Sequence, residues 1–207
     1  MAADVITQAS MRRKTSVITH NTLNLKPPRM QLPKRYRSCK VCDFMKEIVI
    51  RKIRELEIEK LNDMLYEAIY QPNEQTPIPR SVLGIPEVYA YIKDFGKLKD
   101  DYCLVAESYG EIVGAVWVRI LSGNPRGYGY VDDNTPEFAI SLFKEYRNQG
   151  IGTQLMLTMI KYLQERDYIQ TSLSVQKENY AVKLYKKLGF EIIDENDEDY
   201  LMLLKLD

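Results

Sequence analysis

The stretch Arg147-Asn148-Gln149-Gly150-Ile151-Gly152-Thr153 lies between an extended apolar run and a helix-like pattern. The preceding segment 137–143 (EFAISLF) has the length and residue types of a buried strand, and segment 153–163 has apolar residues at helical spacing. The two glycines remove Cβ atoms that would keep a phosphate away from the backbone, and a helix N-terminus offers free N–H groups. The stretch therefore predicts an anion-binding turn, with a merely tight strand-to-helix turn as the alternative.

Length and charge set bounds on the chain around this turn. The 207 residues are enough for one domain with its own core and a short appendage. The net charge is zero, but residues 1–44 contain nine of the 29 Lys and Arg residues against Asp4 and Asp43 alone among the 29 acidic ones. Because this segment also contains three prolines and few periodic apolar positions, we interpret it as a disordered basic extension. Residues 45–207 are the expected folded domain, and Met45 is an alternative translation start.

Composition also disfavours several classes of function. The sequence has no apolar run of about 18 residues and no apolar core of a secretory signal, so no membrane association is expected. Three cysteines without a dense framework are typical of a reducing compartment, and we expect a cytoplasmic location. Cys39 and Cys42 form a lone CxxC, and His20 is the one histidine, so no metal site is expected. Nucleic-acid binding by the basic extension is an alternative that the lack of regularly interleaved aromatic residues disfavours.

Hydrophobic patterning predicts a mixed α/β domain with one sheet and helices on its faces. The predicted strands are 47–53, 102–107, 112–121, 137–143, 169–175, 190–193 and 200–206, and the predicted helices are 55–70, 86–95, 153–163 and 179–188. Ser108-Tyr109-Gly110-Glu111 is a hairpin signature between two of these strands. Segment 122–134 is rich in Gly, Asn, Asp and Pro, so it is predicted to be a loop or hairpin tip.

A second motif, NYAVKLYKKLGF at residues 179–190, follows the predicted strand 169–175. Together with RNQGIG at 147–152, it resembles the GNAT superfamily of acyl-CoA-dependent N-acetyltransferases, which has an Arg/Gln-x-x-Gly-x-Gly/Ala pyrophosphate turn followed by an Asn…Tyr…Gly-Phe helix. Gly114 and Trp117 on a preceding hairpin strand add to the resemblance, which covers roughly residues 45–206. It implies a GNAT-like fold with a central, mostly antiparallel sheet that splays open between its fourth and fifth strands and has helices on both faces.

The resemblance implies that acetyl-CoA, as co-substrate, lies in the gap between strands 137–143 and 169–175. Asn179 would lie near the pantetheine arm, although it stands six residues before Tyr185 where many members have seven; its alternative role is that of helix N-cap. Arg147 has the alternative role of supporting the turn. The implied contacts are the turn residues Arg147, Asn148, Gln149, Gly150, Ile151, Gly152 and Thr153, the strand residues Ile140, Ser141 and Leu142, and Asn179 with Tyr185.

Acetyl transfer requires a neutral amine, a stabilised oxyanion and a proton for the departing thiolate. The resemblance implies that Tyr185 supplies this proton, although Tyr185 also belongs to an apolar helical stripe and has a core role as its alternative. Several members of the family keep a carboxylate at the position of Glu137, ten residues before Arg147, so the resemblance implies Glu137 as the candidate base. A water relay or a mere strand-starting charge are the alternatives.

The function that these residues indicate is direct transfer of an acetyl group to a primary amine in a ternary complex. The acceptor is an unidentified small molecule, peptide or protein, and the oligomeric state is left open between monomer and homodimer. An acetyl-CoA-binding module of the same fold without turnover is the alternative function.

Overall fold

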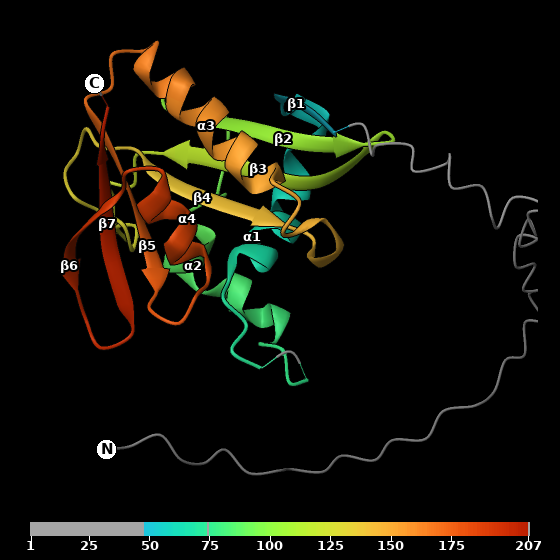
Figure 1. Ribbon diagram of the computed structural model, residues 1–207, viewed down its shortest axis with the longest axis horizontal. Helices are drawn as coiled ribbons and strands as arrows, with labels where there is room; N and C mark the ends of the chain where they lie inside the picture. Colours follow the sequence, from blue (N-terminus) through green and yellow to red (C-terminus); the bar gives the residue numbers. More distant parts are fainter. Residues whose placement is uncertain (1–47, 74, 207) are drawn as a thin grey trace, which may run out of the picture. The chain divides into compact units, whose positions relative to one another are not determined.

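The computed structural model describes residues 48–73 and 75–206, which form one sheet with helices packed on it (Figure 1). The predicted extension 1–44, with its CxxC motif, lies outside the described residues. The seven strands of this sheet follow the order β1-β2-β3-β4-β5-β7-β6, in which β4 and β5 are parallel and the other neighbours antiparallel. The predicted mixed α/β fold with a mostly antiparallel sheet is confirmed.

The strands lie close to their predicted positions, because alternating or continuous apolar residues mark each of them. They are β1 (Ile48–Lys52), β2 (Tyr102–Ser108), β3 (Glu111–Arg119), β4 (Glu137–Leu142), β5 (Gln170–Gln176), β6 (Glu191–Glu195) and β7 (Asp199–Lys205). The predicted hairpin joins β2 to β3 through Tyr109 and Gly110, whose φ angles of 52° and 85° are the left-handed values that a tight hairpin turn requires.

The helices depart more from the prediction. They are α1 (Leu61–Ala68), α2 (Pro86–Tyr89), α3 (Ile151–Gln164) and α4 (Ala181–Lys187), with 3₁₀ segments η2 (Glu55–Lys60), η3 (Arg80–Gly84) and η4 (Lys144–Tyr146). The prediction of one helix over 55–70 was wrong at its start, since η2 buries no residue and therefore has no apolar face to stabilise regular helix.

The predicted helix 86–95 is reduced to the single turn α2. The buried Arg119 guanidinium accounts for this, because it donates hydrogen bonds to the carbonyl oxygens of Ala90 at 2.6 Å and Lys93 at 2.9 Å. The same guanidinium forms a buried ion pair with Asp101 at 2.9 Å. Side-chain bonds thus replace part of the helical pattern and fix the chain after α2 against β3.

Successive residues of the central strands point to opposite faces of the sheet, and each face has its own apolar cluster. Leu104, Val116 and Val118 pack with α3 and α4 on one face of the sheet. Val105 and Trp117 pack with α1 and the α2 segment on the other. Helices therefore cover both faces, as predicted.

The sheet divides between β4 and β5. Their parallel ladder consists of one bridge, Glu137 with Ser172, and the N–H of Ser172 donates to the carbonyl oxygen of Pro136 at 3.1 Å. Beyond Glu137, the edge of β4 that faces β5 has no strand partner in the described part of the chain. The predicted splay between the fourth and fifth strands is confirmed, and it leaves backbone hydrogen-bonding groups of β4 open to a ligand.

Candidate active site

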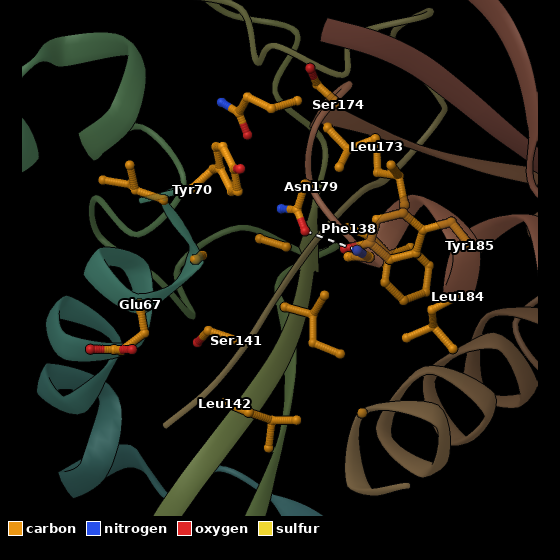
Figure 2. A pocket seen from close by; sticks show the side chains of 18 of the residues that line it. Glu67, Tyr70, Phe138, Ser141, Leu142, Leu173, Ser174, Asn179, Leu184 and Tyr185 are labelled. Atoms are coloured by element: carbon orange, nitrogen blue, oxygen red, sulfur yellow. Dashed lines mark hydrogen bonds between the residues drawn. The ribbon is translucent and has the colours of Figure 1, made fainter. Parts of the chain in front are cut away.

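A cavity of about 890 Å³ opens where the sheet splays (Figure 2). Figure 2 shows Ser141 and Leu142 on β4 in the centre, Tyr185 on α4 to one side and Glu67 on α1 to the other. The predicted residues in the cavity lining come from β4, the turn before α3, the start of α3 and the α4 region, and they are Ile140, Ser141, Leu142, Arg147, Asn148, Gly150, Gly152, Thr153, Asn179 and Tyr185. Most of the predicted cofactor residues therefore share one cavity.

The turn before α3 has the geometry of an open anion site. Asn148 and Gly150 have φ angles of 60° and 80°, and Gly150 is the N-cap of α3. A Cβ added at Gly150 would meet no atom within 4 Å, whereas one at Gly152 would lie 3.3 Å from the Leu142 side chain. The N–H groups in the first turn of α3, after Gly150, have no carbonyl group within the helix to pair with. They are therefore free to bind an anion.

Three predicted turn residues make contacts within the protein. The Arg147 side chain donates to the carbonyl oxygen of Leu142 at 2.9 Å and to the carboxylate of Glu67 at 3.0 Å, so it ties the turn to β4 and α1. The Gln149 amide donates to the carbonyl oxygen of Glu145 at 2.7 Å, and the Ile151 side chain is buried in the core. Neither Gln149 nor Ile151 belongs to the cavity lining, so they can reach a ligand there only through the backbone.

Asn179 lies one residue before the N-cap position of α4, which is occupied by Tyr180. The Asn179 side-chain oxygen accepts a hydrogen bond from the N–H of Ala181 at 2.9 Å, drawn as the dashed line in Figure 2. The predicted N-cap is therefore off by one residue, but Asn179 still stabilises the start of the helix through this bond while it also lines the cavity.

Tyr185 lies at the cavity wall with its ring packed beside Phe190, at a centroid distance of 5.9 Å. The residue is 7% exposed, and its hydroxyl has no hydrogen-bond partner among the described residues. Burial raises the pKa of Tyr185 well above its ordinary value. The phenol therefore keeps its proton near neutral pH, which is the state that a proton donor requires.

Glu137, the first residue of β4, is 2% exposed. Its Oε2 atom accepts hydrogen bonds from the Tyr91 hydroxyl and the Gly129 N–H, both at 2.8 Å, while Oε1 has no partner in the described part of the chain. Burial raises the pKa of Glu137 from 4.5 to about 7, and the two hydrogen bonds partly oppose this shift. The carboxyl group can therefore exchange a proton near neutral pH.

Sequence reasoning did not find the groups that surround this carboxylate. Tyr91 follows α2, and Gly127 and Gly129 belong to segment 122–134, which was predicted as a loop or hairpin tip with no catalytic residue named in it. A Cβ at Gly127 would overlap the Glu137 carboxylate, and one at Gly129 would lie 2.9 Å from its Oε2 atom. The Gly-Tyr-Gly sequence at 127–129 could have indicated this arrangement, because alternate glycines allow the backbone to approach a side chain closely.

The described residues contain no group of three or more His, Cys, Asp and Glu side chains that could hold a metal ion. The helices of residues 48–73 and 75–206 are all too short or too polar to cross a membrane. The lone CxxC and His20 lie outside these ranges, so the structure does not bear on them.

Comparison with known proteins agrees with the fold. A model of the Acetyltransferase (GNAT) family matches residues 45–190. The N-alpha-acetyltransferase of Sulfurisphaera tokodaii is 31% identical over 140 residues, which cover 60% of this chain and 82% of that protein. The chain belongs to the GNAT acetyltransferase family.

Two solved structures share the fold at lower identity. One is the PaiA N-acetyltransferase of Thermoplasma acidophilum in complex with coenzyme A, with TM-score 0.54, 20% identity and coverage of 76% of this chain and 98% of that chain. The other is an acetyltransferase of the GNAT family from Streptococcus pneumoniae, with TM-score 0.56, 21% identity and coverage of 78% of this chain and 100% of that chain.

Proposed function

We propose that this protein is an acetyl-CoA-dependent N-acetyltransferase that transfers the acetyl group directly to a primary amine in a ternary complex. The observation that supports this most is the single cavity at the splay. Its lining includes the turn before α3, the open edge of β4 and Tyr185, and it also includes Tyr91, which is hydrogen-bonded to Glu137.

The cavity suits a long ligand with phosphate at one end and amide groups along its length. Free N–H groups at the start of α3, with Gly150 open beside them, would hold the pyrophosphate of acetyl-CoA. The unpaired edge of β4 at residues 140–142 would hold the pantetheine amides in the manner of an added strand. Asn148, Gln149, Ile151 and Thr153 would contribute through their backbone, and Arg147 by fixing the turn to β4.

Two residues have the protonation states that the chemistry needs. Tyr185 would donate a proton to the departing thiolate, because burial keeps its phenol protonated. Glu137 would take the proton that the amine loses, because a base with a pKa of about 7 combines ionisation with useful basicity near neutral pH.

The alternative function, an acetyl-CoA-binding module without turnover, does not account for the buried carboxyl group of Glu137. A carboxyl group that is 2% exposed and has one oxygen without a partner among residues 48–73 and 75–206 destabilises the folded protein whenever it is ionised. Binding of acetyl-CoA at the turn and the β4 edge does not require such a group, whereas a carboxyl group with a pKa of about 7 suits deprotonation of an amine. Glu137 therefore favours catalysis.

The acceptor side of the cavity is formed by the end of α1, by η3 and α2, and by the turn between β6 and β7. It is mostly apolar at Val82, Ile85 and Val88, while Glu198 and Asp199 supply carboxylates. These carboxylates would attract the ammonium form of an approaching amine. The shared property of suitable acceptors is thus a cationic amine next to an apolar group.

The test uses the full chain with acetyl-CoA and three amines: spermidine, a tripeptide amide with a free N-terminus, and Nα-acetyl-lysine amide. Thiol release and the mass of the amide product report transfer, and calorimetry reports acetyl-CoA binding. We expect binding and acetylation of at least one amine. Binding without any transfer would leave the binding module as the function, and absence of binding would reject both.

A further inference from the structure

The Glu137 carboxylate cannot touch an amine in the cavity directly. It is 2% exposed and covered by the backbone of Gly127 and Gly129. In the described part of the chain, Tyr91 and Tyr128 belong to the cavity lining and Glu137 does not. A base at this position needs an intermediary that has contact with both the carboxylate and the cavity.

We propose that the Tyr91 hydroxyl is this intermediary and relays the proton from the acceptor amine to Glu137. The inference rests on the proposed N-acetyltransferase function. Tyr91 donates a hydrogen bond to Glu137 Oε2 at 2.8 Å and accepts one from the Tyr128 N–H at 2.9 Å. A phenolic oxygen has two lone pairs. The Gly129 N–H, which donates to Glu137 Oε2, also acts on the Tyr91 oxygen but less than the Tyr128 N–H does, so an amine that binds Tyr91 takes the place of this second contact.

The proton balance of the relay is simple. An N–H bond of the acceptor ammonium breaks as a new O–H bond forms at the Tyr91 oxygen. At the same time the original O–H bond of Tyr91 breaks and its proton joins Glu137 Oε2. The net result is a neutral amine and a protonated Glu137, with no free tyrosinate, and reversal of the same path returns the proton to water after the product leaves.

The backbone around Tyr91 is held rigidly enough for this task. The Trp117 indole N–H donates to the Tyr91 carbonyl oxygen at 3.2 Å, and Arg119 holds the carbonyl groups of Ala90 and Lys93. The Tyr91 ring lies nearly parallel to that of Tyr128, with a centroid distance of 6.4 Å and an angle of 12°. These contacts fix the hydroxyl against the carboxylate, as a relay requires.

The charged group nearest to Glu137 in the strand register is already neutralised, while Glu87 and Asp199 act on the neighbouring Tyr128 and not on Glu137. Arg119 is the cross-strand partner of Glu137 in the β3–β4 register, but its guanidinium is paired with Asp101 at 2.9 Å. The influences on the pKa of Glu137 are therefore burial, Tyr91 and the Gly129 N–H. Removing the Tyr91 hydroxyl leaves the carboxylate with fewer donors and raises that pKa further.

The experiment compares wild type with Tyr91→Phe, and with Tyr89→Phe as the matched control. Tyr89 lies on the neighbouring α2 turn, is 41% exposed and does not belong to the lining of this cavity. The amine is whichever of the three probes wild type acetylates fastest. The readouts are kcat and KM against pH, the Kd for acetyl-CoA, and the titration of Glu137 by ¹³C NMR, assigned with Glu137→Gln.

We expect Tyr91→Phe to lower kcat by about 10²-fold with little change in the Kd for acetyl-CoA, and to move the acidic limb of the kcat/KM profile and the Glu137 titration to higher pH. Tyr89→Phe should match wild type. A Tyr91→Phe variant within twofold of wild type at every pH, or one with an unchanged Glu137 titration, would overturn the relay while leaving the acetyltransferase proposal intact. Wild type that acetylates no probe amine would instead defeat the proposed function, and the relay with it.

Discussion

At the scale of single residues, the ionisation of Glu137 links the chemistry to the stability of the fold. The folded-state pKa of about 7 lies above the ordinary value of 4.5, so the folded protein favours the protonated carboxyl group. The contribution of protonated Glu137 to the free energy of unfolding is complete below pH 4.5 and is lost as the pH rises to about 7. At ~1.4 kcal/mol per pH unit, the loss amounts to about 3 kcal/mol at most.

Glu137→Gln should remove this pH dependence. Between pH 4.5 and 8, the free energy of unfolding of the variant should gain up to about 3 kcal/mol relative to wild type, measured by urea denaturation across the range. The acidic limb of kcat/KM near pH 7 should disappear, with turnover lowered about 10²–10⁴-fold. A free energy of unfolding of wild type that does not change from pH 5 to 8 would contradict this.

Tyr185→Phe should lower turnover without changing stability or acetyl-CoA affinity. The substitution keeps the ring that packs beside Phe190 and removes a hydroxyl without a partner among the described residues, so stability and acetyl-CoA affinity should barely change. We expect a loss of about 10²-fold, at the low end for general acids, because a thiolate with a pKa of about 8.5 is already a tolerable leaving group. Tyr109→Phe, at the exposed β2–β3 turn, is the control for hydroxyl removal. A Tyr185→Phe variant with wild-type kcat would assign Tyr185 to the core.

At the scale of elements, the turn before α3 is the structure on which the proposed binding of acetyl-CoA depends. Gly150→Glu places bulk and negative charge where phosphate is expected, and we expect at least a 10²-fold weaker Kd by calorimetry. Gly150→Ala is the control, because both variants strain the backbone at a φ of 80°, by roughly 1–2 kcal/mol, but alanine adds no charge. Equal affinities of the two variants would show that phosphate lies elsewhere.

Elements with an apolar period were predictable, and elements shaped by tertiary contacts were not. β4, α3 and α4 bury regular apolar stripes, so hydrophobic spacing located them along with the turn between β4 and α3. The segment after α2 is shaped by Arg119, and the surroundings of Glu137 by a hydrogen bond across 46 residues of sequence. No local pattern records such contacts, which is why the strand carrying Glu137 could be predicted and its partner Tyr91 could not.

At the scale of the whole described molecule, two parts of the sheet meet at one bridge between β4 and β5. Acetyl-CoA lying in the splay would contact both parts and couple them. We expect hydrogen exchange of β5, α4 and β7 to slow when acetyl-CoA is added, and the free energy of unfolding to rise by about 2.7 kcal/mol at 100 times the Kd. Protection confined to the start of α3 would place the ligand outside the splay.

The close approach of Gly127 to the Glu137 carboxylate makes the two positions thermodynamically interdependent. A side chain at 127 would occupy the space of the carboxylate, so Gly127→Ala should be severely destabilising in the wild-type background and much milder in Glu137→Ala, where that space is empty. In a library randomised at both sites, folded variants should divide into glycine at 127 with a large residue at 137, and larger residues at 127 with a small one at 137. A protein of this family could thus exchange the proposed base at 137 and the glycine that covers it through one compensated pair of substitutions while keeping its fold.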